Sequence, residues 1–551
     1  MAIAFHHFIR IDSIADAYKE LNRKVSTELV VEENFITEEE ARNYPIDTSE
    51  KLSTIDDFEL LGGKQTSKIS FFNTIQPEIW VSSEKRPLFE HYVKNFNAEN
   101  FSINGQPIEI LYRIIPSIEA TRMISAGEYR PDGLAPSNIH PYVILESQGL
   151  HPTIIEESLV PNIAGLVIKK KDYKKLSTNG GEVEFSSVVN AIASGQLSVG
   201  YPNPLTSSSG LNFLMAILSS ASIDNLTLAN LHSQAVKSVF DRVQENVSIT
   251  TPTTLDVLEA YRQDSDKFQI FPLEYQNYQQ LKSLPEFEDT VFIPYGIIHS
   301  NPLIGFMANT PEEQDALAKF AAYVKSPAMQ QKSRELGFVE TDYFQANQDR
   351  IIPNGNLISQ AQSYWKTNKD GGKTVYSMVV VDNSGSMREQ GALEAVKAGL
   401  NHAAKEINLG NQIGLITFND YPTYRVKIDG WNTLQHQKFL AAVSQLKPEG
   451  ETAFYDAILL ALSELMEKKQ NDPNSSCYLL VLTDGESNRG FEYHQVQKIL
   501  EYSGVSFLPI AYGNVNRTQL EAISIGESSF VTEGTSENIE ELLHDLFSVS
   551  F

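Results

Sequence analysis

The sequence is poor in cysteine, in long apolar runs and in basic residues. Its 551 residues include a single cysteine, Cys477, which excludes an intramolecular disulfide. No stretch reaches the ~18–20 consecutive apolar residues of a membrane-spanning helix, so we expect no transmembrane segment. Only 44 basic residues stand against 70 acidic ones, and the formal charge of −26 argues against nucleic-acid binding and against non-specific attachment to anionic membranes. An acidic chain is, however, compatible with divalent cations.

Motifs of catalysis and export are also missing. Neither the nucleophile motif G-x-S-x-G nor the zinc motif H-E-x-x-H occurs, and Cys477 lacks the exposed, electropositive setting of a nucleophile. We therefore expect a protein that is not an enzyme. Residues 1–10 lack a basic region followed by an apolar core, and no cysteine near the start could carry a lipid. We expect a cytoplasmic protein if the chain begins here, and an extracytoplasmic one if an export segment or anchor precedes it.

The most informative stretch is an apolar, β-branched run that ends in a polar turn. Residues 376–381 read Tyr-Ser-Met-Val-Val-Val, and Asp382, Ser384 and Ser386 follow in the pattern D-x-S-x-S. The run predicts a buried strand of a parallel sheet, with the polar triplet in the loop at its carboxyl end, where open α/β sheets bind ligands. One carboxylate and two hydroxyls on a tight turn offer the hard oxygen ligands that Mg²⁺ prefers.

Two later loops add oxygen ligands to this set. Thr452 lies in a Gly-Glu-Thr-Ala turn between amphipathic helices predicted over 434–446 and 454–468, and Asp484 follows an apolar strand predicted over 478–483. This arrangement resembles the metal-ion-dependent adhesion site of von Willebrand factor type A domains, whose pattern is D-x-S-x-S, then a Thr, then an Asp after a later strand. The other interpretation is a Rossmann-like sheet whose loops carry Asp and Ser only as helix caps.

The resemblance implies a bound divalent cation, Mg²⁺ or else Ca²⁺ or Mn²⁺. Its ligands would be Asp382, Ser384, Ser386, Thr452 and Asp484. In the family, the serines and the threonine would coordinate the metal directly or through water, the aspartates often act through water, and one coordination position stays open. A Glu or Asp of a protein partner usually fills that position, so we expect metal-dependent protein recognition.

A second feature is a helix start that is crowded with hydroxyl groups. Within residues 199–214, a turn precedes a helix that opens with Thr206, Ser207, Ser208 and Ser209. Free backbone N–H groups, hydroxyls and the helix dipole would all point at one spot, which favours an anion. Simple serine capping of the helix is the alternative.

Other segments between about 69 and 365 give this helix a context. An extended strand and a Ser-Ser turn lead into a helix over 80–96, a polar loop ends at Ser137, strands are predicted over 163–169 and 292–302, and an amphipathic helix over 311–325. This order is similar to type 2 extracellular solute-binding proteins, the molybdate- and phosphate-binding group.

That resemblance implies two α/β lobes joined by two crossing strands, here 166–169 and 297–306. Lobe one would comprise 69–165 and 291–365, and lobe two 166–290. The cleft between them would be lined by Ser82, Ser83, Ser137, Thr206, Ser207, Ser208 and Ser209. We expect a small anionic or polar ligand there. Since the Arg or Asp of the family's anion sites cannot be placed, a degenerate cleft that transports nothing is the alternative.

The domain organisation follows from these matches. Residues 1–68 form an N-terminal segment of unknown role, with a helical pattern over 10–21, a capping box at Thr37 and a polar linker over 43–64. A solute-binding-like domain over 69–365 comes next. A second linker over 366–373 leads to the A-type domain over 369–551. The predicted fold class is therefore α/β, with a two-lobed domain followed by a Rossmann-like, doubly wound domain.

We predict a non-catalytic binding protein. The A-type domain would recognise a protein through the metal, and the solute-binding-like domain would hold a small ligand or a second protein. One alternative is a cytoplasmic adaptor of a ring-forming ATPase, since A-type domains also serve as metal-dependent partners of such machines. A metal-dependent hydrolase is a further alternative, but such a site needs a general base or a second metal, and no such group is identifiable.

Overall fold

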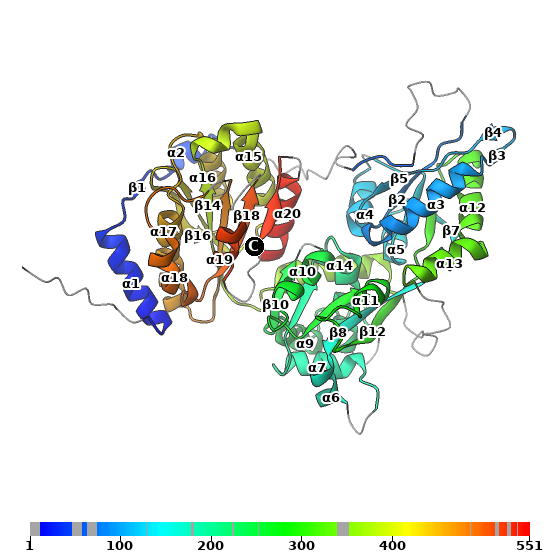
Figure 1. Ribbon diagram of the computed structural model, residues 1–551, viewed down its shortest axis with the longest axis horizontal. Coiled ribbons are helices and arrows are strands. Elements are labelled where there is room, and N and C mark those ends of the chain that lie inside the picture. Colours follow the sequence, from blue (N-terminus) through cyan, green and yellow to red (C-terminus); the bar gives the residue numbers. More distant parts are fainter. Residues whose placement is uncertain are drawn as a thin grey trace, which may run out of the picture. The chain divides into compact units, whose positions relative to one another are not determined.

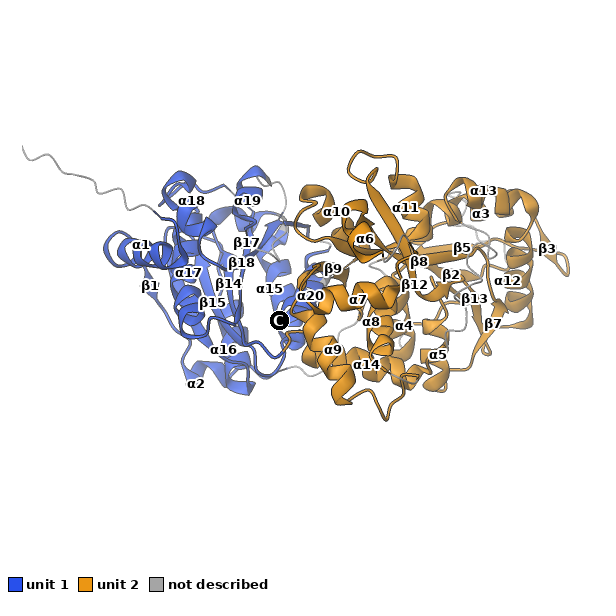
Figure 2. Ribbon diagram, turned by 90° about the horizontal axis from the view of Figure 1, so that it is seen from below, with its two compact units in different colours: residues 1–51, 372–551 blue, residues 52–371 orange. Residues whose placement is uncertain are grey.

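The chain folds into two compact units, which Figure 2 distinguishes by colour. The computed structural model describes residues 11–46, 55, 58–62 and 74–551, apart from 128, 178–180, 223–224, 252, 339–351, 485, 513–516, 526–530 and 537. Unit 1 comprises residues 1–51 and 372–551, and unit 2 comprises residues 52–371. The two ends of the sequence therefore fold together, and unit 2 is inserted between them.

Unit 1 is a doubly wound α/β domain on a seven-stranded sheet (Figure 1). The strand order is β1-β16-β15-β14-β17-β18-β19; β16 runs antiparallel to β15, and the other neighbours are parallel. The strands are β1 Glu32–Glu33, β14 Val375–Asp382, β15 Gln412–Phe418, β16 Pro422–Gly430, β17 Ser476–Thr483, β18 Ser506–Tyr512 and β19 Thr532–Gly534. The helices are α1 Ile14–Thr27, α2 Glu38–Ala41, η4 Gly385–Gly391, α15 Ala392–Ala403, η5 Ala404–Glu406, α16 Thr433–Ser444, α17 Phe454–Asn471, α18 Tyr493–Glu501, α19 Arg517–Ile523 and α20 Ile539–Ser550.

The central strand β14 explains why the sheet is covered on both faces. Met378 and Val380 join the apolar core that α17 and α18 form on one face. Val379 and Val381 point to the opposite face because side chains alternate along a strand, and all four are fully buried. A β-branched run of this kind suits a parallel strand between two helix layers.

The N-terminal residues complete one edge of this sheet. Ser13 caps α1, and Ala17 and Leu21 are fully buried where α1 packs on α17 and α18. Strand β1 pairs with β16, and the predicted capping box at Thr37 is present at the start of α2, which packs on α16. The segment thus covers part of β16, which would otherwise be an open edge. Residues 1–10 and much of the predicted linker over 43–64 lie outside the described residues.

Unit 2 contains two five-stranded sheets, one in each of two lobes. In lobe one the order is β5-β2-β6-β13-β7, and in lobe two it is β10-β9-β11-β8-β12. The strands of lobe one are β2 Glu78–Val81, β5 Leu111–Ile114, β6 Gly133–Ala135, β7 Pro152–Glu156 and β13 Leu303–Phe306, beside a small ribbon of β3 Ser102–Ile103 and β4 Gln106–Pro107. The strands of lobe two are β8 Asn162–Lys169, β9 Val199–Pro202, β10 Val247–Thr251, β11 Ile270–Glu274 and β12 Thr290–His299.

Helices surround both of these sheets (Figure 1). Those of lobe one are η2 Ser83–Lys85, α3 Arg86–Ala98, α4 Ser117–Ala126, α5 His140–Ser147, α12 Pro311–Val324 and α13 Pro327–Glu335. Those of lobe two are α6 Lys170–Leu176, α7 Phe185–Ala193, α8 Ser208–Ser220, α9 Gln234–Gln244, α10 Thr254–Gln263 and α11 Tyr275–Leu281. The last helix of the unit is α14 Gly355–Asn368.

Two connections that the structure describes carry the chain between the lobes. It enters lobe two before β8, and it returns to lobe one between β12 and β13. Because β12 pairs with β8 up to His299, the return lies between His299 and Leu303, within the crossing that we predicted over 297–306. The β12 register shifts between Pro294 and Ile298, and Gly296 there has a φ of +70°. A Cβ on Gly296 would lie 2.0 Å from Oδ1 of Asn212, so only glycine fits this bend.

Helix α14 fastens the two lobes to each other. Its Trp365 is fully buried, and the indole N–H donates to the Tyr201 hydroxyl of lobe two at 2.7 Å. The same apolar core contains Ile118 and Ile144 of lobe one. The helix ends at Asn368, so the linker predicted over 366–373 begins inside it.

Candidate metal centre

The loop after β14 holds Asp382 in a buried position at the carboxyl end of the sheet. The side chain is fully covered, and Oδ1 accepts the backbone N–H of Ser384 at 2.8 Å. Oδ2 accepts the hydroxyl of Thr483, the last residue of the neighbouring strand β17, at 2.5 Å. Asp382 is therefore fixed between two adjacent parallel strands.

The two serines of the motif link Asp382 to Asp484. The hydroxyls of Ser384 and Ser386 lie 3.0 Å apart, and the Ser386 hydroxyl donates to Oδ1 of Asp484 at 2.7 Å. A chain of hydrogen bonds thus runs from Asp382 through both serines to Asp484. The structure brings these four predicted ligands to one place, although the first and the last are 102 positions apart in the sequence.

The Thr452 loop is fastened to the other two loops. The carbonyl of Gly450 accepts the N–H of Gly385 at 3.1 Å, which ties this loop to the serine turn. The N–H of Thr452 donates to the side chain of Asn488 at 2.8 Å, and the Thr452 carbonyl accepts the Asn488 N–H at 3.2 Å. Thr452 itself is buried. All three loops that carry predicted ligands are thereby held against one another.

The electrostatics of this site fit a cation. Burial raises the pKa of Asp382 to about 6, against the lowering effect of its hydrogen bonds to Ser384 and Thr483, and the nearby charge of Asp484 adds to the rise. Burial also raises the pKa of Asp484. Within the described ranges, neither carboxylate forms an ion pair with a basic side chain. A buried and a half-buried carboxylate that lack a counter-charge, beside hydroxyl oxygens, are a suitable donor set for a hard divalent ion.

Hydroxyl ligands are essential to any such assignment. Among the residues that the structure describes, no group of three His, Cys, Asp or Glu side chains is placed to hold a metal. A cation at Asp382 and Asp484 would therefore take its remaining protein ligands from Ser384, Ser386 and Thr452. These residues could supply oxygen but no further negative charge, so a bound divalent ion would remain attractive to an outside anion.

An arginine that the sequence motifs did not indicate lies beside the Thr452 loop. Arg489 contacts Glu451 at 3.1 Å and Asp420 at 3.4 Å, and it follows Asn488, which holds the Thr452 loop. Thr483, which fixes Asp382, was also missed. The position of Thr483 at a strand end, directly before Asp484, could have indicated a role in the site. No pattern near Arg489 in the sequence indicates its contact with Asp420.

The hydroxyl residues predicted for the cleft of unit 2 lie on both lobes, and several already have acceptors. Ser82 and Ser137 donate to the same oxygen of Glu84, at 2.6 and 2.8 Å. Ser209 donates to Glu274 at 2.7 Å. These three hydroxyls are thus used within the protein by carboxylates, which would repel a bound anion.

The remaining cleft residues are more varied. Ser83 is exposed at the start of η2, and the N–H of Thr206 donates to the Asn203 carbonyl at 3.3 Å. Ser207 caps α8 by accepting the N–H of Gly210, as the capping alternative expected. The Ser208 hydroxyl is buried and has no hydrogen-bond partner in the described part of the chain.

A buried polar network joins the lobes behind these residues. The Glu274 carboxylate lies 2.8 Å from Nδ1 of His299, and Nε2 of His299 lies 3.1 Å from the Asn138 side chain of lobe one. The Gln276 side chain of lobe two donates to the carbonyl of Glu84 in lobe one at 3.2 Å. None of these residues was singled out from the sequence, and the two contacts between the lobes each join residues more than a hundred positions apart.

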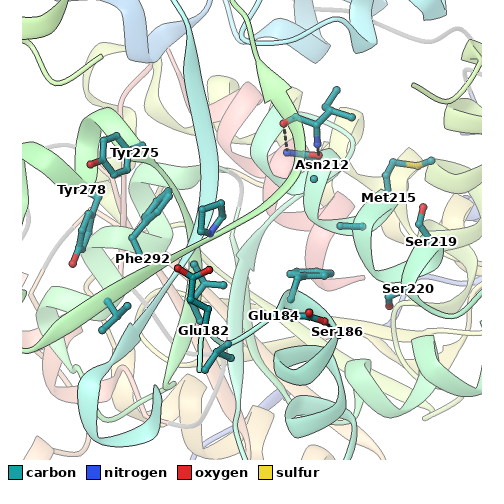
Figure 3. A pocket seen from close by; sticks show the side chains of 18 of the residues that line it. Glu182, Glu184, Ser186, Asn212, Met215, Ser219, Ser220, Tyr275, Tyr278 and Phe292 are labelled. Carbon is teal, nitrogen blue, oxygen red and sulfur yellow. Dashed lines mark hydrogen bonds between the residues drawn. The ribbon is translucent and has the colours of Figure 1, made fainter. Parts of the chain in front are cut away.

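A separate pocket of about 1710 Å³ lies along β12. Figure 3 shows Tyr275, Tyr278 and Phe292 on one side of it and Asn212 and Met215 on the other. None of the hydroxyl residues predicted for the cleft is among those that line it.

Comparison with known families separates the two units. Residues 378–547 match the model of the von Willebrand factor type A domain, and residues 78–339 match that of the bacterial extracellular solute-binding protein. The chain is a fusion of these two domain types. The A-type domain coincides with the C-terminal part of unit 1, and the solute-binding-like domain lies within unit 2. Both are binding domains that are typically non-catalytic, and the predicted order and α/β class are confirmed.

Solved structures of both kinds are similar to the chain. A von Willebrand factor type A protein from Catenulispora acidiphila has 16% identity over 32% of this chain and 42% of that chain, with a TM-score of 0.28. The sulfate-binding protein SubI from Mycobacterium tuberculosis has 14% identity over 49% of this chain and 88% of that one, with a TM-score of 0.35. Iron-bound HitA from Pseudomonas aeruginosa has 12% identity over 54% and 99%, with a TM-score of 0.38.

Among curated proteins, none is similar enough to this chain to count as a match. Of the helices that the structure describes, none combines the length and the apolar character needed to cross a bilayer.

Proposed function

We propose that the A-type domain binds a divalent cation and uses it to capture an acidic side chain of a protein partner. The observation that carries this proposal is the hydrogen-bonded chain from Asp382 through Ser384 and Ser386 to Asp484. Asp382 is buried and Asp484 half-buried, and no basic side chain among the described residues neutralises either carboxylate. Mg²⁺ is the first expectation, with Ca²⁺ or Mn²⁺ as substitutes.

The charge balance supports recognition of an anion. If Asp382 and Asp484 act mainly through water, as the family resemblance implies, and Ser384, Ser386 and Thr452 add no charge, the ion would keep positive character at its open position. A ligand position that the protein leaves open would then favour a carboxylate over water, because a charged oxygen binds a hard cation more strongly. An acidic protein repels acidic partners in general, so such an ion would provide a local exception.

For the solute-binding-like domain, the hydrogen bonds argue against a free oxyanion in the predicted cleft. Ser82, Ser137 and Ser209 would have to break bonds to Glu84 or Glu274 before they could donate to a ligand. We propose that this domain serves protein binding, or holds a polar ligand that can itself donate hydrogen bonds to these carboxylates.

The metal proposal is tested by calorimetric titration of the full chain with MgCl₂ and MnCl₂. Asp382→Asn should abolish specific cation binding. The matched control is Asp429→Asn, because Asp429 is exposed. Asp429 pairs with Ile413, and Ile413 pairs with Ser377 near the start of β14, so Asp429 lies at the end of the sheet opposite to Asp382. Equal titration curves for the wild type and Asp382→Asn would show that the assigned centre is wrong.

The partner proposal is tested with peptides selected from a random display library on the full chain in Mg²⁺. Selected peptides should be released by EDTA. Each should also lose binding when one particular Asp or Glu is changed to its amide, while amide changes at its other acidic positions have little effect. Peptides that bind equally well in EDTA would place recognition elsewhere on the protein.

A further inference from the structure

Two histidines hold the C-terminal helix α20 against α15 in a reciprocal arrangement. His402 of α15 contacts Glu540 of α20 through Nδ1 at 3.0 Å. In the reverse direction, His544 of α20 contacts Glu406 of η5 through Nε2 at 3.2 Å. The two imidazole rings are in contact, with centroids 4.8 Å apart and planes tilted by 52°. We call these four residues, with Asp545, the histidine brace.

The brace lies beside a close approach of the two helices. Helices α15 and α20 run side by side in unit 1 (Figure 1). A Cβ on Gly399 would be 2.8 Å from the Leu543 side chain and 3.2 Å from Cα of Glu540, so the backbones meet directly one turn before His402. The His402 and His544 side chains are only 12% and 13% exposed. Any change in their charge therefore acts inside a tight helix–helix contact, where water screens it poorly.

Charged groups reach the brace from every side. Glu540 and Asp545 come from α20, Glu406 and Lys405 from η5, and His436 of α16 lies near Lys405. Carboxylates outnumber the single lysine, which favours one positive imidazole. Two positive rings at this spacing would repel each other, so the arrangement suits one charged and one neutral histidine.

The two rings are accordingly biased in opposite directions. Burial acts to lower the pKa of His544, but its contacts with Asp545 and Glu406 outweigh burial and raise the pKa to about 9. Burial and the neighbouring charge of His544 lower the pKa of His402, in spite of Glu540. Near neutral pH, His544 is charged and His402 is neutral.

We propose that the histidine brace is a pH-sensitive clamp that holds α20 on α15 most firmly near neutral pH and loosens on either side. The alkaline limit follows from His544: the stabilisation is complete below the ordinary histidine pKa of 6.5 and is lost as the pH rises through about 9. The acidic limit follows from His402: its burial penalises protonation, so the clamp weakens as the pH falls below 6.5.

The test is amide hydrogen exchange of the full chain, measured by mass spectrometry between pH 5 and 10 and corrected for the intrinsic exchange rate. The fraction of time that α20 is open should be smallest between about pH 6.5 and 7. It should rise on the order of tenfold between pH 7.5 and 9.5, and rise again below pH 6.5. Peptides from β14 report opening of the whole unit. The ratio of α20 exchange to β14 exchange therefore measures the opening of α20 alone.

Two variants separate the limits of the window. His544→Gln should remove the alkaline rise, and His402→Gln should remove the acidic rise while keeping the alkaline one. The matched control is His494→Gln on α18, where the histidine is 72% exposed and should alter neither limit. A flat corrected profile for wild-type α20, or both rises surviving in both variants, would overturn the proposal. If His544→Gln does not fold, the wild type and His402→Gln alone still decide it.

Discussion

Replacing Asp382 with asparagine separates the electrostatic penalty of this buried carboxylate from its use as a metal ligand. Asparagine keeps the shape, and its Oδ1 can still accept the N–H of Ser384. The amide can donate to Thr483 where the carboxylate accepted its hydroxyl. The variant therefore changes the charge of the site with little change in packing.

The size and sign of the effect follow from the pKa of Asp382. Because folding raises that pKa from 3.8 to about 6, the folded state binds the proton more tightly. Stability contributed by the neutral carboxyl is present below pH 3.8 and is lost as the pH rises through about 6. The loss is at most about 3 kcal/mol at pH 7.5, since each pKa unit corresponds to about 1.4 kcal/mol.

Asp382→Asn should therefore be more stable than the wild type in EDTA at pH 7.5, by up to this amount, and about equally stable near pH 4. Added Mg²⁺ should reverse the order, because only the wild type gains binding energy. Hydrogen exchange of β14 peptides in the full chain reports this domain alone. A variant that is less stable than the wild type in EDTA by the same margin at both pH values would refute the electrostatic reasoning.

Three further results are expected. Thr452→Ala should weaken Mg²⁺-dependent peptide capture at least several-fold without lowering the melting temperature of the domain, whereas an equal loss in EDTA would contradict a metal role. Sulfate, phosphate and molybdate should leave the thermal unfolding of unit 2 unchanged, and stabilisation by any of them would show that the cleft hydroxyls are available. Leu21→Ala should destabilise unit 1 by about 2–5 kcal/mol in denaturant unfolding followed by exchange of β14, since Leu21 is fully buried, and a negligible effect would mean that α1 does not belong to this core.

The sequence was informative where a local pattern decides the structure. The β-branched run of β14, the capping box at Thr37 and the order of the metal-site loops are all local features, and each appears where it was predicted. Clustering of Asp382, the two serines and Asp484 followed from the rule that parallel strands present their carboxyl ends at one edge.

The sequence did not predict hydrogen bonds between side chains that are far apart along the chain. Nothing near Ser209 indicates that it donates to Glu274, and nothing near Ser137 indicates Glu84, so hydroxyl-rich turns looked free for a ligand. The role of the N-terminal residues could not be predicted either, because the apolar stripe of α1 packs on α17 and α18, which lie more than 400 residues later. Whether the five metal-site residues hold a cation stays a prediction until it is measured.

The insertion of unit 2 into unit 1 has a consequence for synthesis of the protein. The pairing of Glu32 with Thr423 joins residues on either side of the whole inserted unit. As the chain emerges, α1 must wait with its apolar stripe uncovered until β14 to β18 have been made, whereas unit 2 has a complete core and can fold during that delay. A core substitution that slows the folding of unit 2 should therefore lower the yield of correctly folded unit 1, although it alters none of the residues of that unit.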